Sequence, residues 1–289
     1  MLGIKFVLLA SAIKRKCEIL RTVPDLISSV SNLLREAAET CVLPVFGKRE
    51  ANSEEKSPGE WVTEADKAGE AFLAPALRSL ITDSLVVGEE AASADPMVLD
   101  QLTDDGIVWL IDPLDGTSNF ASGLPPFAIM VALVRNGETA ASWILDPITD
   151  RLSVSEKGSG SWINGERITV GEDSPELSDM SGAVLRRFLP QKLAEHVDAV
   201  EGRFANLSLG SKCAGFDYPT IAKGSMDFAL YWRTLPWDHA PGVLFLQEAG
   251  GQAARLDGSA YRVANHARSG LLVSRNKEIW AKVKSTLLI

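Results

Sequence analysis

The feature that most constrains this sequence is a hydrophobic strand that runs directly into two aspartates. Residues 108–120 read VWLIDPLDGTSNF, so the apolar run enters Asp112, Pro113 and Asp115 before a Gly-Thr step. Pro113 has no N–H and should end regular strand pairing, and the Gly-Thr step can begin a helix whose first N–H groups are free. Both carboxylates and the carbonyl of Leu114 could then point the same way. Such oxygens suit a hard cation and a phosphate; a turn with two solvated aspartates is the alternative.

Length and charge limit the class of protein. The chain has 289 residues, 46% of them hydrophobic, which is ample for one large domain or two closely packed halves. Its formal net charge of -9 argues against a nucleic-acid groove, because acidic surfaces repel the phosphate backbone. A small phosphorylated ligand would also be repelled unless metal cations reverse the local field.

Three widely spaced cysteines, at positions 17, 41 and 213, form no CxxC motif. This spacing argues against a disulfide framework or a zinc site and predicts a cytoplasmic location, where thiols stay reduced.

Residues 1–22 are expected to be a ragged or mobile extension. Their apolar run is too short to cross a membrane, and the heavier positive charge follows the run, whereas a signal peptide carries it before. No other segment approaches a membrane span, so no membrane partner is expected.

Periodicity divides the rest into an α+β half, 23–173, and an α/β half, 174–289. The first half is predicted to contain helices over 23–43 and 63–80, a polar loop over 48–60, a strand over 84–87 and an antiparallel meander over 107–170. Asn136-Gly137 is a strong hairpin turn within the meander. In the second half, strands over 182–185, 203–207, 228–231 and 270–273 should alternate with helices over 191–200, 216–223, 240–249 and 277–287.

Two other segments also end an apolar stretch with a carboxylate. Gly88-Glu89-Glu90 follows the short strand, and Trp237-Asp238 stands at the start of a helix after Pro236. Each has an ordinary explanation, since loop ends carry charges and aspartate is a common N-cap. Thr63 and Asp66 have the spacing of a helix capping box.

Taken together, these three segments closely resemble the signatures of the inositol monophosphatase family, which are magnesium-dependent, lithium-sensitive phosphatases. The matching stretches are 88–90 (GEE), 112–120 (DPLDGTSNF) and 237–242 (WDHAPG), in the family's order. The similarity extends from about Val23 to the C-terminus. It implies the layered αβαβα sandwich of the inositol monophosphatase and fructose-1,6-bisphosphatase superfamily, and a homodimer.

The resemblance also implies site roles. Two or three Mg²⁺ ions would be held by Glu89, Asp112, the carbonyl of Leu114, Asp115 and Asp238. The N–H groups of Gly116 and Thr117 would receive the phosphate, and Thr117, with Asp115, would take part in catalysis by positioning the attacking water.

One position departs from the family pattern. In the family, the residue three positions before the threonine of the Val-Thr-x-x-Asp segment is commonly Asp. That residue is taken to pair with the water-activating threonine, which is Thr117 here. In this chain the segment's threonine is Thr63, so Glu60 stands at that position. Glutamate can do the same proton work with a longer arm. It can equally be a loop charge.

The substrate is less constrained. Tyr231 stands where inositol-specific members carry a sugar-binding Glu, and Arg233 could bind a second anionic group or be a surface charge. Asp238 would also face the substrate. The segment after Asp115 lacks the Lys-Glu of bisphosphate nucleotidases. The family resemblance alone makes inositol monophosphate the leading expectation, with histidinol phosphate, sugar bisphosphates and, less favoured, a 3′(2′),5′-bisphosphate nucleotide as alternatives. A regulatory binding protein that keeps the fold is the non-enzymatic alternative.

Overall fold

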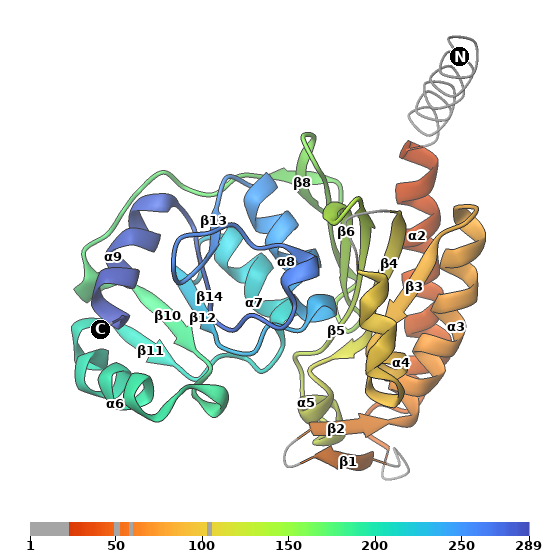
Figure 1. Cartoon of the computed structure of the whole chain (residues 1–289), viewed down its shortest axis with the longest axis horizontal. Helices are drawn as coiled ribbons and strands as arrows, with labels where there is room; N and C mark the ends of the chain where they lie inside the picture. The colour runs from red at the N-terminus through yellow and green to blue at the C-terminus, as the bar shows by residue number, and fades with distance from the viewer. Residues whose placement is uncertain (1–22, 49–52, 58–59, 103–105, 289) are drawn as a thin grey trace, which may run out of the picture.

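The chain folds into five layers in the order helix, sheet, helix, sheet, helix, visible from right to left in Figure 1. The computed structural model describes residues 23–48, 53–57, 60–102 and 106–288. The predicted αβαβα sandwich is confirmed. The extension predicted over 1–22 lies outside the described residues, and the boundary placed at residue 173 stays a prediction.

The first sheet has seven strands in chain order, with β3 parallel to β4 and every other pair antiparallel. Its strands are β3 (Leu85–Gly88), β4 (Ile107–Asp115), β5 (Ala128–Arg135), β6 (Glu138–Asp146), β7 (Arg151–Glu156), β8 (Gly160–Ile163) and β9 (Glu166–Ile168). Helices α2 (Val23–Ala37) and α3 (Glu64–Leu80) cover its outer face. The predicted meander and the turn at Asn136-Gly137 are confirmed.

Side chains alternate across this sheet because successive residues of a strand point to opposite faces. Trp109, Val131 and Trp143 pack toward α2 and α3, in one core cluster. Met130 and Ile144, each next in sequence to one of these, belong to the cluster between the sheets. Strands buried on both faces read as nearly continuous apolar runs, which is why β4 and β5 appear so hydrophobic in the sequence.

The second sheet has five strands in the order β11-β10-β12-β14-β13. Their bounds are β10 (Ser181–Val184), β11 (Asn206–Ser208), β12 (Phe228–Tyr231), β13 (Gln252–Arg255) and β14 (Leu271–Ser274). Helices α7 (Ala214–Ala222) and α8 (Pro236–Glu248) fill the space between the two sheets, and α6 (Gln191–Val200) and α9 (Lys277–Leu287) cover the far face. Strand β13 was not predicted, because its short sequence QAAR has no distinct apolar alternation.

Two predictions of local structure were wrong in informative ways. The polar segment 48–60 was predicted as a loop, but its described part contains strand β1 (Ser53–Ser57), which pairs with β2 (Glu60–Thr63). Strand β1 (SEEKS) has no apolar residue, so no hydrophobic periodicity reveals it. Helix α8 begins at Pro236, which places Asp238 inside the first turn rather than at the cap. The capping box of Thr63 and Asp66 is confirmed.

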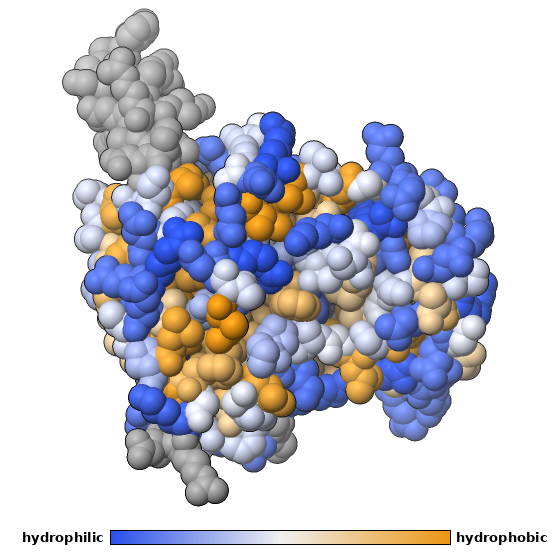
Figure 2. All heavy atoms as spheres, turned by 180° about the vertical axis from the view of Figure 1, so that it is seen from behind, coloured by the Kyte–Doolittle hydropathy of each residue, from blue (hydrophilic) through white to orange (hydrophobic). Residues whose placement is uncertain are grey.

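The opposite face of the molecule shows hydrophobic residues mainly over the half built on the seven-stranded sheet (Figure 2). Among the described residues no helix is long and apolar enough to cross a membrane. Cys41 and Cys213 are free thiols.

Close packing of α7 against α8 depends on a glycine. A Cβ at Gly242 would lie 2.1 Å from the ring of Tyr218, which is fully buried. We expect Gly242→Ala to lower the free energy of unfolding by about 1–3 kcal/mol, because the ring has no room to move. The control Gly202→Ala, where a Cβ meets no atom within 4 Å, should change it by less than about 0.5 kcal/mol. Urea unfolding of both variants measures this; equal effects would contradict it.

Candidate active site

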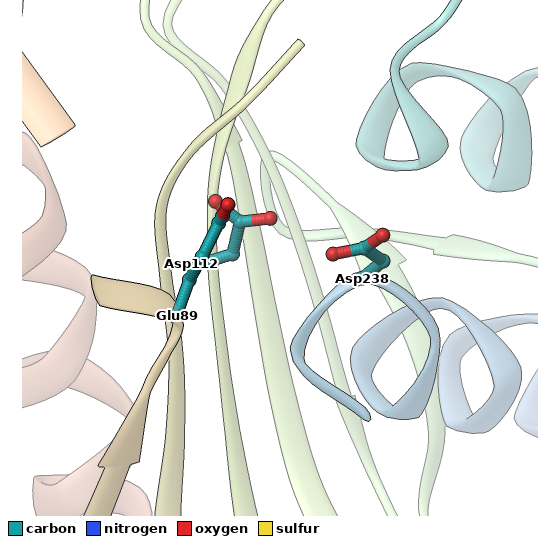
Figure 3. Close-up of side chains that lie close together, drawn as sticks. All are labelled: Glu89, Asp112 and Asp238. Atoms are coloured by element: carbon teal, nitrogen blue, oxygen red, sulfur yellow. The ribbon is translucent and has the colours of Figure 1, made fainter. Parts of the chain in front are cut away.

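Three carboxylates that are far apart in the sequence converge where the first sheet meets helix α8. Glu89 follows β3 as the first residue of α4 (Glu89–Ala94), Asp112 lies on the adjacent β4, and Asp238 lies in the first turn of α8. Each offers an oxygen within 4.8 Å of the others. In Figure 3 Glu89 and Asp112 lie beside each other, opposite Asp238 on its helix. The structure therefore brings together three of the predicted metal ligands.

A bulge in β4 places Asp112. Regular pairing with β5 holds up to Asp112 opposite Met130, and resumes at Asp115 opposite Ala128, so β4 has one extra residue in between. Pro113, which cannot donate to the ladder, stands inside the bulge, as the sequence predicted. The freed N–H of Leu114 donates to Asp112 Oδ1 at 3.0 Å and orients that carboxylate.

Asp115 faces the second half of the molecule. Its Oδ2 accepts a hydrogen bond from the backbone N–H of Gly215 in α7 at 2.6 Å, and its carbonyl accepts one from the Cys213 thiol at 3.6 Å. This buried carboxylate therefore connects β4 to α7. It is not one of the three clustered ligands, and its role as a metal ligand stays a prediction.

The electrostatics of the cluster are unfavourable without a cation. Burial, and then the neighbouring carboxylates, raise the pKa of Glu89 and of Asp112 well above their usual ranges. Burial and the charge of Asp238 raise the pKa of Asp115 to about 8. Burial raises the pKa of Asp238 to about 6, although the charge of Arg233 opposes the shift. Like charges and low polarity both disfavour the ionised forms.

A lysine from the polar hairpin reaches the cluster. Lys56 Nζ lies 2.5 Å from Glu90 Oε1 and 3.7 Å from Glu89 Oε1. Burial lowers the pKa of Lys56, but the hydrogen bond to Glu90 and the charge of Glu89 raise it overall. Because 48–60 was predicted as a loop, no sequence pattern placed this cation at the site.

The position of Glu89 is fixed by Glu70, which binds the backbone of the two residues that follow Glu89. The two carboxylate oxygens of Glu70 accept the N–H groups of Glu90 and Ala91, at 2.8 and 2.9 Å, and so satisfy the free N-terminus of α4. Gly88 makes this approach possible, since a Cβ there would lie 2.3 Å from the Glu70 carboxyl carbon.

Thr117 begins α5 (Thr117–Ala121), after Gly116 turns the chain with a φ of 89°. Its hydroxyl lies 3.0 Å from Asp66 Oδ1 and 2.9 Å from the carbonyl of Leu114. Asp66 Oδ2 accepts both the N–H and the hydroxyl of Thr63, at 2.8 and 2.6 Å. Burial raises the pKa of Asp66 to about 6. Asp66 is therefore both the N3 residue of the capping box of α3, whose N-cap is Thr63, and the acidic partner of Thr117.

The sequence analysis considered Glu60 for this place, with a loop charge as the alternative, whereas the group bonded to the Thr117 hydroxyl is Asp66. The catalytic role of Glu60 stays a prediction. Glu60 lies in β2, but its side chain is outside the described residues. The available signal was the Val62-Thr63-x-x-Asp66 pattern itself. Its aspartate was explained fully by capping, so a second role was not considered.

A cleft opens above the carboxylates in two connected parts. The first, of about 360 Å³, is lined in part by Glu89, Thr117 and Lys56. The second, of about 510 Å³, extends past Asp238 to Tyr231. Both parts are lined by Trp61, Ser118, Arg187, Lys212 and Arg233.

The predicted substrate-binding residues line this cleft but differ in their exposure and in their contacts. Tyr231 is buried, and its hydroxyl donates to Asp217 Oδ2 at 3.2 Å. Arg233 is exposed, with its guanidinium 4.3 Å from the centre of the Phe188 ring. Asp217 is itself buried, so the Tyr231–Asp217 pair is part of the wall of the cleft.

Comparison with known proteins identifies this arrangement. The model of the inositol monophosphatase family matches residues 25–287. A Thermotoga maritima protein named fructose-1,6-bisphosphatase/inositol-1-monophosphatase is 31% identical over 68% of this chain and 72% of its own length. Nus factor SuhB of Vibrio cholerae is 30% identical over the same shares, 68% and 72%. The solved structure of a Thermotoga maritima IMPase matches with a TM-score of 0.74 and 28% identity, over 91% of this chain and 96% of that one.

The chain belongs to the inositol monophosphatase family. Its relatives carry two kinds of name, phosphatase and Nus factor, so membership does not by itself fix what this chain does.

The raised pKa values predict how stability depends on pH. A carboxyl whose pKa rises from 3.8 unfolded to about 8 folded, as for Asp115, contributes stability below pH 3.8 that is lost as the pH rises toward 8. We therefore expect the Tm of the EDTA-treated protein to fall between pH 5 and 8. Mg²⁺ should raise the Tm more at pH 8 than at pH 5. At 100 times its Kd, a bound ligand raises the free energy of unfolding by about 2.7 kcal/mol.

Thermal unfolding with and without Mg²⁺, in parallel with Asp238→Asn, measures this effect. The variant removes one charge from the cluster and should reduce both the loss of Tm and its recovery by Mg²⁺. An Mg²⁺ effect that is the same at both pH values would contradict the clustered-carboxylate explanation.

Proposed function

We propose that the chain is a magnesium-dependent phosphomonoesterase that hydrolyses a small phosphorylated alcohol. The observation that carries the proposal is the convergence of the Glu89, Asp112 and Asp238 carboxylates beside the Thr117–Asp66 hydrogen bond. A cation site next to a hydroxyl that is bonded to a carboxylate is what hydrolysis by an activated water requires.

The residues fit magnesium. All three clustered groups are carboxylates, and Mg²⁺ prefers oxygen ligands and keeps several waters of its own, so few protein ligands suffice. Asp115 and the carbonyl of Leu114 are proposed as further ligands of two or three ions. When bound, Mg²⁺ would neutralise phosphate charge and make a water more acidic.

The chain's own groups would then orient the attack. Thr117 Oγ1 has its hydrogen directed to Asp66 Oδ1 or the Leu114 carbonyl, so its lone pairs can accept a hydrogen bond from the water. The water oxygen would bond to phosphorus while the ester P–O bond breaks and its electron pair stays on the alcohol oxygen, which takes a proton from solvent. The proton released by the attacking water would move through Thr117 to Asp66. The pKa of about 6 for Asp66 suits a group that accepts a proton near neutral pH. Backbone N–H groups of Gly116 and Thr117 are proposed to receive the phosphate.

Family membership and the name of the Thermotoga maritima relative support inositol monophosphate as the first substrate to test, and a sugar bisphosphate as the second. Histidinol phosphate remains an alternative, and a bisphosphate nucleotide the least favoured one. Inhibition by lithium, a homodimer and a cytoplasmic location are further expectations of the family resemblance.

The second candidate function is a binding protein that keeps the fold. The relative named Nus factor SuhB favours this function. Because of this relative, the net charge of the chain is not a sufficient reason to exclude nucleic-acid partners. The intact cluster and the Thr117–Asp66 pair favour catalysis, because a binding role needs neither.

Phosphate release in the presence of Mg²⁺ tests the proposal. The substrates are inositol 1-phosphate, histidinol phosphate, fructose 1,6-bisphosphate and 3′-phosphoadenosine 5′-phosphate, each with and without Li⁺. We expect Mg²⁺-dependent turnover of at least one ester, inhibited by Li⁺, with Asp112→Asn about 10²-fold slower or worse, since it removes a cluster ligand. If no ester is turned over while Mg²⁺ still raises the Tm, the binding protein is the better description.

The role of Asp66 has its own test. Asp66→Asn keeps the size of the side chain and can still cap α3, but it cannot accept a proton. We expect kcat to fall by about 10²–10⁴-fold with little change in the Mg²⁺ concentration needed for half-maximal activity. The control Glu64→Gln removes an equal charge from an exposed position in the same turn and should keep kcat. A kcat of Asp66→Asn equal to that of the control would rule out the proton role.

A further inference from the structure

The Gly-Glu-Glu segment at 88–90 is only partly explained by the cation site. Glu89 belongs to the carboxylate cluster, whereas Gly88 and Glu90 do not. Both of these residues contact a half-buried carboxylate on another helix, Glu70 of α3. Helices α3 and α4 lie side by side in Figure 1 and are in contact. The two unexplained positions of the segment therefore direct attention to α3.

Glu70 uses both oxygens of its carboxylate on the backbone of α4. Oε2 accepts the N–H of Glu90 at 2.8 Å, and Oε1 accepts the N–H of Ala91 at 2.9 Å. Two bonds to successive N–H groups leave this turn little freedom to rotate. Glu89 comes directly before the two bonded residues, so the direction of its side chain is set by the same contact.

Gly88 leaves the space that this carboxylate occupies. A Cβ at position 88 would lie 2.3 Å from the carboxyl carbon of Glu70, and 2.3 and 2.6 Å from its two oxygens. Those atoms form the end of a flexible side chain, so a methyl group here would displace Glu70 and break both of its bonds to α4. The φ of Gly88 is −107°, which any residue adopts, so the glycine is needed for space and not for backbone freedom.

The surroundings of Glu70 show that its carboxylate does not serve stability alone. Burial raises the pKa of Glu70, although the two N–H groups oppose the shift. The negative charge of Glu90 adds to the increase. A carboxylate is therefore costly to the folded state here, as is typical of a group that serves a site. The side chain of Glu90 is held separately by Lys56, whose Nζ lies 2.5 Å from Oε1.

The same face of α3 carries the acidic partner of Thr117. Asp66 and Glu70 are four residues apart, so their side chains lie on one face of the helix, one turn from each other. Between them Gly69 packs on the β4 bulge, where a Cβ would lie 3.1 Å from Cβ of Pro113. One helix face therefore reaches the Thr117 hydroxyl through Asp66 and the start of α4 through Glu70.

We infer that Glu70, lying in the space left by Gly88, is a positioning residue that sets the affinity for Mg²⁺ by fixing the backbone that carries Glu89. This inference rests on the role of Glu89 as an Mg²⁺ ligand in the proposed function. Groups that orient a metal ligand change metal affinity by about 10–100-fold when they are replaced. Glu70 then governs metal binding, whereas Asp66 governs the chemical step. The competing explanation is that Glu70 only attracts cations through its charge.

Calorimetric titration with Mg²⁺ separates the two explanations. Glu70→Asp keeps the charge but is one methylene shorter, so it cannot reach both N–H groups. Gly88→Ala leaves every charge in place and displaces Glu70. We expect each variant to raise the Kd for Mg²⁺ by about tenfold or more. Asn276→Ala is the matched control, because it removes the N-cap of α9 on the far face of the second sheet; it should lower the Tm and leave the Kd unchanged.

A double variant tests whether Gly88 acts through Glu70. In a Glu70→Ala chain there is no carboxylate to displace, so the further change Gly88→Ala should raise the Kd by less than about twofold. Additive effects would show that the two residues act separately, and would overturn the inference. An unchanged Kd in both Glu70→Asp and Gly88→Ala would also overturn it, because only the charge of Glu70 would then matter.

Kinetics with any ester that is turned over give a second readout. Glu70→Asp should raise the Mg²⁺ concentration for half-maximal activity by the same factor as the Kd and change kcat at saturating Mg²⁺ little, the reverse of the result expected for Asp66→Asn. If the wild-type chain binds Mg²⁺ but hydrolyses no ester, the proposed function alone has failed, and the Kd values still decide the role of Glu70. A wild-type chain that binds no Mg²⁺ would reject both.

Discussion

Mutual repulsion among three closely packed carboxylates, one buried and two half-buried, is the constraint on which the rest of this structure depends. Glu89, Asp112 and Asp238 place oxygens within 4.8 Å of one another, and burial raises the pKa of each. Asp112 lies in the first sheet, Glu89 directly follows strand β3 of that sheet at the start of α4, and Asp238 lies in the helix layer between the sheets. A cation at this point would therefore join the layers as well as provide the chemistry.

The surrounding scaffold holds these groups together in spite of their repulsion. Glu70 fixes the start of α4 under Glu89, the bulge at Pro113 fixes Asp112, and Asp115 bonds to the N–H of Gly215. None of these contacts is large in energy. The stability that keeps these contacts formed comes from the apolar clusters on both sides of each sheet.

Local patterns predicted the parts of the structure that local physics controls. Alternation and turn chemistry located the strands of the first sheet, and the Asp-Pro-Leu-Asp motif predicted the break in β4. Strand β1, which carries Lys56, was missed because all of its residues are polar and show no hydrophobic period. Asp66 was missed as a site residue because its capping bonds to Thr63 already explained it, and its contact with Thr117 spans 51 residues.

The sequence by itself determined the family, the layered fold and three of the clustered ligands, because each is encoded in a short motif whose residue types and order are specific. Only the tertiary structure decided which group accepts the Thr117 hydroxyl, and where the positive charge of the cleft gathers. Arg187, Lys212 and Arg233 come from three separate segments of the chain. Their proximity results from the packing of the sheets and helices between those segments, and no local pattern records that packing.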